Sequence, residues 1–186
     1  MGESLADKTS VESSWVDLLT AAIYGSEVID LATSGYTTFH LLPHKPFTRT
    51  DLSLVDTARN ITKAIALRPD CIIIVLGSHD LRRGWNNDAI VNNLEELRTQ
   101  TSIANIDYYI TTSLPVAGPE ALTEQVLIQK EQILQYYGKQ AINLFDHMAT
   151  PESLPDPELF TTSLTTLNEA GHKRVFSLIW QQVTSR

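Results

Sequence analysis

A short apolar run at residues 71–76 constrains the fold more than any other feature of the chain. The run is rich in isoleucine and valine and is followed by Gly77, which is typical of a strand buried on both faces of a parallel sheet. Apolar residues recur at helical spacing on both sides of it, at Leu54, Ala58, Ile61 and Ile65 and again within residues 88–99. A strand between two such helices predicts a parallel sheet with both faces covered by helices.

The same alternation continues along the whole chain. Strands are predicted at residues 27–32, 106–112 and 141–145, and helices around residues 15–23, over 119–137 and from Leu167 onward. No linker, low-complexity run or internal repeat interrupts this pattern, so residues 1–186 are expected to form a single three-layer α/β/α domain. Ligands of such sheets bind at the carboxyl ends of the strands, so the candidate site residues are those that follow each strand.

Composition argues against several classes of protein. The 14 lysines and arginines are outnumbered by 22 aspartates and glutamates, and the net charge of −8 argues against a nucleic-acid partner bound through its phosphates. A single cysteine excludes an internal disulfide and a cysteine-based zinc site, and no glycine-rich phosphate loop follows a strand, so no metal or other cofactor is expected. No apolar run approaches the ~20 residues that span a bilayer, and no signal peptide is visible, which predicts a cytoplasmic protein without a membrane span.

Four segments, taken in order, resemble the sequence blocks of the GDSL, or SGNH, hydrolase family. They are residues 2–5 (GESL), 29–38, 75–81 and 167–172, and together they span nearly the whole chain. The resemblance implies a flavodoxin-like α/β/α domain that hydrolyses esters or acyl groups of small substrates. In the family a serine attacks the carbonyl carbon, and a histidine oriented by an aspartate three residues earlier takes the serine proton. The serine amide, a glycine amide and an asparagine side chain bind the oxyanion.

Carried over by position, the resemblance places Ser4 at the nucleophile and places Ser4 and Gly35 in the oxyanion hole. His79 stands where the family has asparagine; its imidazole can donate to the oxyanion or serve instead as a displaced base for Ser4. Ser163 and Thr166 stand at the aspartate and histidine positions. Neither hydroxyl acts as an acid or a base near neutral pH, so we expect weak turnover or none.

The start of the chain departs from the family as well. The family's nucleophile follows a central strand, whereas only Met1 precedes Gly2 here, so the first strand is expected to be missing. A native chain that starts upstream of Met1 is the simplest explanation; closure of the gap by neighbouring strands and occupation by another segment or chain are the alternatives. Two functions stay open: a weak serine hydrolase of small esters, and an inactive member of the family that serves as a binding or scaffolding domain.

Three further features lie in or near the third and fourth blocks. Asp80 is predicted to cap the helix after Leu81 rather than to act as a catalytic acid. Arg82 and Arg83 are expected to form a solvated pair, with an anionic group of the substrate as the alternative partner. His172 is expected to be a half-exposed residue of the last helix.

Overall fold

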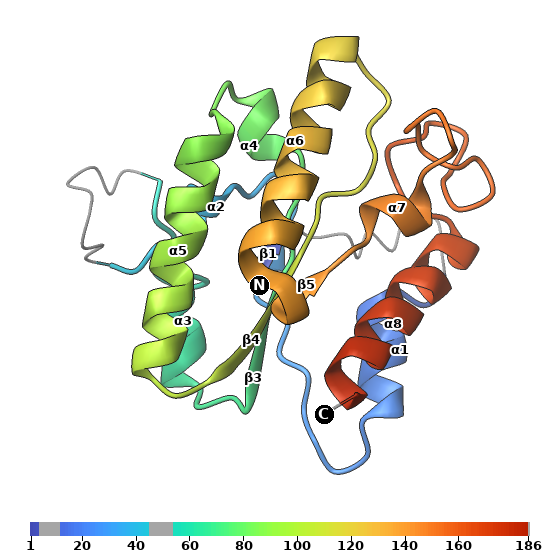
Figure 1. Cartoon of the computed structure of the whole chain (residues 1–186). Helices are drawn as coiled ribbons and strands as arrows, with labels where there is room; N and C mark the ends of the chain where they lie inside the picture. Colours follow the sequence, from blue (N-terminus) through green and yellow to red (C-terminus); the bar gives the residue numbers. More distant parts are fainter. Residues whose placement is uncertain (4–11, 45–53, 186) are drawn as a thin grey trace.

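A parallel sheet lies at the centre of the structure, a computed structural model that describes residues 1–3, 12–44 and 54–185 (Figure 1). Three of its strands are hydrogen-bonded in the order β3 (Cys71–Ile74), β4 (Asp107–Thr111) and β5 (Ala141–Ile142). β3 comes from the apolar run, and its alternate side chains enter different cores: Ile72 and Ile74 pack into one, Ile73 and Val75 into the other. The prediction of a strand covered on both faces is therefore confirmed.

Residues 1–3 join this sheet to a second pair of parallel strands, β1 (Gly2–Glu3) and β2 (Ala32–Thr33). Gly2 lies beside Ala32 on one side and forms a bridge to Val75 on the other. The Met1 nitrogen donates to the Ile73 carbonyl, and the Val75 nitrogen donates to the Met1 carbonyl, both at 2.8 Å. The first strand, expected to be missing, is thus represented by two residues that lie between β2 and β3.

A cavity of about 490 Å³ lies beside the start of this short strand. Its lining includes the apolar residues Met1, Leu19, Ile23, Val28 and Ile73. It lies beside Met1, between the segment that leads into β2 and the first residues of β3.

Helices cover both faces of the sheet, as the alternating pattern predicts. One face packs on α3 (Ile61–Ala66), α5 (Asn87–Ile103) and α6 (Glu120–Tyr137), and the other packs on α1 (Trp15–Ala22) and α8 (Glu169–Thr184). Figure 1 shows these two layers on opposite sides of the strands. Short helices follow several strands: α2 (Thr38–Leu41), α4 (His79–Arg82) and α7 (Phe145–Met148), together with a 3₁₀ turn at Gly138–Gln140.

Several predicted elements are shorter than expected. The strand predicted at residues 27–32 is reduced to Ala32–Thr33, and the strand predicted at 141–145 ends at Ile142. The helix that begins at Ile61 starts later than the apolar spacing from Leu54 suggests, because the Asn60 side chain accepts from the Lys63 nitrogen and caps it. None of the helices in the described ranges is both long and apolar enough to cross a membrane.

Candidate active site

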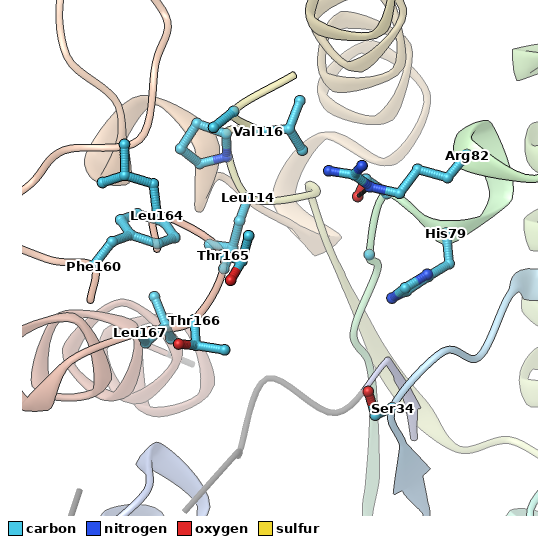
Figure 2. Close-up of a pocket in the computed structure, with 14 residues that line it drawn as sticks. Ser34, His79, Arg82, Leu114, Val116, Phe160, Leu164, Thr165, Thr166 and Leu167 are labelled. Atoms are coloured by element: carbon cyan, nitrogen blue, oxygen red, sulfur yellow. Dashed lines mark hydrogen bonds between the residues drawn. The ribbon is translucent and has the colours of Figure 1, made fainter. Parts of the chain in front are cut away.

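A pocket of about 400 Å³ lies at the carboxyl ends of the strands (Figure 2), the edge where the topology predicts a ligand site. Ser34 reaches it from the end of β2, His79 from the segment after β3, and Leu114 from the segment after β4. The opposite side is formed by the loop before α8, including Phe160 and Thr166. Elements far apart in the sequence thus converge on one cleft.

His79 is the first residue of α4, and its ring points from that helix into the pocket (Figure 2). Partial burial, and then the charges of Arg82 and Arg83, lower the pKa of His79 below its ordinary value of 6.5. The imidazole is therefore neutral at pH 7. In that form one ring nitrogen accepts a proton while the other donates a hydrogen bond, so the side chain suits either role predicted for it.

Asp80 is a buried carboxylate that holds α4 in place. It accepts from the Thr38 nitrogen at 2.9 and 3.1 Å and from the Thr38 hydroxyl at 2.7 Å, and that hydroxyl in turn accepts from the Asn93 amide at 2.8 Å. Burial raises the pKa of Asp80 to about 6. The predicted role of Asp80 as a helix cap is wrong, because Asp80 lies within α4, whose N-cap position is Ser78, and the Asn86 side chain caps α5. The network joins α2, α4 and α5 and so fixes the helix that carries His79.

Gly35 follows β2 with a φ of 80°, a conformation that glycine adopts without strain. Its carbonyl accepts from Arg83 at 3.4 Å, which links this turn to α4. Its neighbour Ser34 lines the pocket, whereas Gly35 is not among the lining residues. The structure therefore brings Gly35 beside the cleft, and its predicted place in an oxyanion hole stays a prediction.

Ser4, the predicted nucleophile, lies outside the described residues. The last described residue before it, Glu3, ends β1 and pairs with Thr33, immediately before Ser34. The predicted contact between Ser4 and His79 therefore stays a prediction.

The loop before α8 carries the hydroxyl side chains of Ser163 and Thr166, which the sequence comparison by position predicts to stand at the family's acid and base positions. Thr166 lines the pocket, whereas Ser163 is exposed and lies away from it. The Thr161 hydroxyl links the two, at 2.8 Å from the Thr166 hydroxyl and 2.9 Å from the Ser163 hydroxyl. Such a cluster exchanges hydrogen bonds but does not take up a proton near neutral pH.

The other imidazoles lie elsewhere. Of the five histidines, all of them in described segments, His79 alone lines this pocket. His172, expected to be half-exposed, is buried in α8, and its Nδ1 accepts from the Trp15 nitrogen at 3.3 Å. Its burial comes from the packing of α8 on α1, which apolar spacing within one helix does not reveal. Over the described ranges, no three histidine, cysteine, aspartate or glutamate side chains gather in a way that could hold a metal ion.

Comparison with known proteins gives both a family and a set of similar folds. Residues 1–174 match the model of the GDSL-like Lipase/Acylhydrolase family. A search of the curated proteins finds no match. Among solved structures, a G-D-S-L family protein from Desulfitobacterium hafniense is similar, with a TM-score of 0.76 and 13% identity over 98% of this chain and 96% of that one.

Two further structures share the fold. The psychrotrophic esterase EstA from Pseudoalteromonas, inhibited by monoethylphosphonate, has a TM-score of 0.65 and 17% identity over 98% of this chain and 93% of its own. The OSK domain of Drosophila Oskar has a TM-score of 0.56 and 16% identity over 70% of this chain and 73% of its own. At these identities the likeness establishes the three-layer fold.

Proposed function

Because the chain belongs to the GDSL-like lipase/acylhydrolase family, as its four sequence segments predict, we propose that it is a weak hydrolase of small esters. The observation that carries the proposal is a neutral imidazole, that of His79, facing the pocket at the carboxyl ends of the strands. A serine hydroxyl needs a neighbouring base to become a nucleophile, and His79 is the candidate base that lines the cleft.

In the proposed reaction the Ser4 oxygen attacks the ester carbonyl carbon while His79 takes the serine proton. The oxyanion of the tetrahedral intermediate accepts from the backbone amides of Ser4 and Gly35. The imidazolium of His79 then gives its proton to the leaving alcohol oxygen, which leaves an acyl group on Ser4. Water then attacks this acyl group while His79 takes its proton. His79 returns that proton to the leaving Ser4 oxygen, which releases the carboxylic acid and restores the Ser4 hydroxyl and the neutral imidazole.

The surroundings of His79 account for a low rate. Arg82 and Arg83 stand beside it, and their positive charges disfavour the imidazolium that each proton transfer creates. In the family an aspartate favours that same ion. A poorly matched base forfeits part of the roughly 10²- to 10⁴-fold that general acid–base catalysis contributes. Turnover is therefore expected to fall below that of a complete triad by a factor of this order.

A second candidate function is binding without turnover. It is favoured by the hydroxyl cluster of Thr161, Ser163 and Thr166, which leaves the family's acid and base positions without a titrating group. In this alternative the pocket takes up an ester or acylated ligand and releases it unchanged.

Hydrolysis of 4-nitrophenyl butyrate by the purified protein separates the two functions. Ser4→Ala is expected to abolish saturable turnover and His79→Ala to reduce it to near the background rate, whereas the matched control Ser34→Ala, at a hydroxyl that lines the same pocket, retains it. A fluorophosphonate should also label the wild type at Ser4, as peptide mass analysis would show. Equal rates for wild type and Ser4→Ala, with no label, would refute hydrolysis and leave the binding function.

A further inference from the structure

The pocket has two chemically different walls. Apolar side chains form one of them: Leu114, Val116, Phe160, Leu164 and Leu167. The helix α4 forms the other, where Figure 2 shows Arg82 and His79 extending from the same short helix toward the cleft. A volume of about 400 Å³ falls in the range typical of small-molecule sites. The cleft therefore suits a ligand that is apolar at one end and polar at the other.

Arg82 is oriented by a neighbouring side chain and keeps its charge available. Its Nε donates to the Ser78 hydroxyl at 3.0 Å, which restrains the long side chain. No ion pair within the described part of the chain involves Arg82, so the two terminal nitrogens of its guanidinium face the cleft without a carboxylate partner. A planar fork of this kind binds carboxylate or phosphate oxygens in pairs.

The charge around Arg82 is unusual for this chain. Arg83 follows it directly and donates to the Gly35 carbonyl at 3.4 Å, so a second guanidinium group lies near α4, although it does not line the pocket. The chain as a whole carries a net charge of −8. A local positive region on an acidic protein attracts anions to that place and repels them elsewhere.

We propose that Arg82 binds an anionic group of the ligand, a carboxylate or a phosphate, while the apolar wall takes its hydrocarbon part. For the proposed hydrolase, on which this extension rests, the substrate is then an ester that also carries a negative charge. Arg82 selects the substrate, and His79 performs the proton transfer.

Calorimetric titration tests the anion subsite without any turnover. The probes are hexanoate, butyl phosphate and the neutral hexanamide, and the variants are Arg82→Gln, Arg82→Lys and the matched control Arg174→Gln, which removes the same charge from exposed Arg174 on α8. The wild type is expected to bind at least one of the two anions with a Kd at least about tenfold lower than that of hexanamide. Charge-assisted hydrogen bonds are stronger than hydrogen bonds between neutral groups. Arg82→Gln should lose this preference, Arg82→Lys should keep part of it, and Arg174→Gln should keep all of it.

The tighter anion identifies the ligand as a carboxylate or a phosphate. Equal binding of anions and hexanamide by the wild type, or an undiminished preference in Arg82→Gln, would overturn the proposal. Because Arg82 is exposed, its variants should melt at the wild-type temperature.

A kinetic arm separates this proposal from the hydrolase proposal. For hydrolysis of 4-nitrophenyl hydrogen glutarate and its neutral counterpart 4-nitrophenyl valerate, Arg82→Gln should lower kcat/KM for the charged ester about tenfold relative to the neutral one. The ratio of the two esters is the readout, because removing the Arg82 charge also acts on the His79 imidazolium and so changes both rates together. A preference for the anionic probes that depends on Arg82 and persists in Ser4→Ala, without ester turnover in the wild type, would refute hydrolysis and retain the subsite. If the wild type hydrolyses both esters and Arg82→Gln leaves the ratio of their kcat/KM values unchanged, the hydrolase proposal stands and the anion subsite is refuted.

Discussion

Replacing Gly171 with alanine tests how closely α8 is docked against the loop that lines the pocket. Gly171 lies in the first turn of α8, where an added Cβ would stand 2.1 Å from the Leu159 carbonyl oxygen. The same oxygen accepts from the Asn168 nitrogen at 3.1 Å, and Asn168 caps the helix by accepting from the Gly171 nitrogen at 3.0 Å. The helix start and the loop therefore share a contact that leaves no room for a methyl group.

The size of the effect follows from this overlap. In an exposed helix, alanine is about 1 kcal/mol more favourable than glycine. At position 171 the methyl group must move away from the Leu159 oxygen by about 1 Å, which takes the Asn168 bond beyond hydrogen-bond range and costs about 1–3 kcal/mol. Strain from the added volume costs about 1–3 kcal/mol more. The net loss is about 3 kcal/mol, or roughly 10 °C in Tm for a chain of this length.

Thermal and urea unfolding, followed by circular dichroism, measure this loss. The matched control is Ala170→Gly at the exposed neighbour, which should lose about 1 kcal/mol through helix propensity alone. Gly171→Ala should therefore be the less stable of the two variants, although it carries the better helix former. A Gly171→Ala protein as stable as the wild type would refute the close docking of α8 on Leu159.

Three further predictions concern the buried carboxylate, the positions predicted for the family's acid and base, and the short first strand. The pKa of Asp80 is about 6 in the folded state against 3.8 for the free side chain, so the wild type should lose up to about 3 kcal/mol of stability as the pH rises from 4 to 7. The Asp80→Asn variant should not show this pH-dependent loss of stability. Urea unfolding curves of the variant that keep the wild-type pH dependence would contradict the prediction. The double variant Ser163→Asp/Thr166→His should raise kcat/KM for 4-nitrophenyl butyrate by about 100-fold, more than either single variant; no gain in the assay would mean that the missing acid and base do not limit the rate. Gly2→Ala places a Cβ 2.1 Å from the Val75 carbonyl and should cost about 3 kcal/mol, whereas Gly25→Ala, where the φ is 79° and the space is open, should cost about 1 kcal/mol. Equal melting temperatures for the two glycine variants would argue against the close approach of β1 to β3.

The sequence predicts strands best where the chain itself supplies their partners. The run at residues 71–76 forms β3 because β4 pairs along it, register by register, from Cys71 beside Asp107 to Ile74 beside Ile110. Residues 27–32 have a similar local pattern, yet only Ala32–Thr33 is extended, because β1 offers only Gly2 and Glu3 as partners. Propensity acts on single residues, whereas a strand needs a neighbour to satisfy its backbone.

The sequence predicts where the candidate site lies, but it does not predict the buried hydrogen bonds that hold α4 beside it. Parallel topology predicts that residues after the strands converge, and His79 and Ser34 do meet at one pocket. The prediction that Asp80 caps a helix is wrong because its hydrogen-bond partner Thr38 lies 42 residues away in the sequence. No local sequence pattern indicates such a contact. The role of Ser4 as nucleophile rests on the resemblance and awaits the labelling experiment.

The hydrogen bond from the Met1 nitrogen to Ile73 has a practical consequence for producing the protein. A residue joined to that nitrogen would start beside the cavity that Met1, Leu19 and Val28 line. An amino-terminal affinity tag would therefore start inside the molecule and compete with its packing. Val183, near the end of α8, lines the same cavity, so a tag at the carboxyl end also needs a spacer that carries it away from this space.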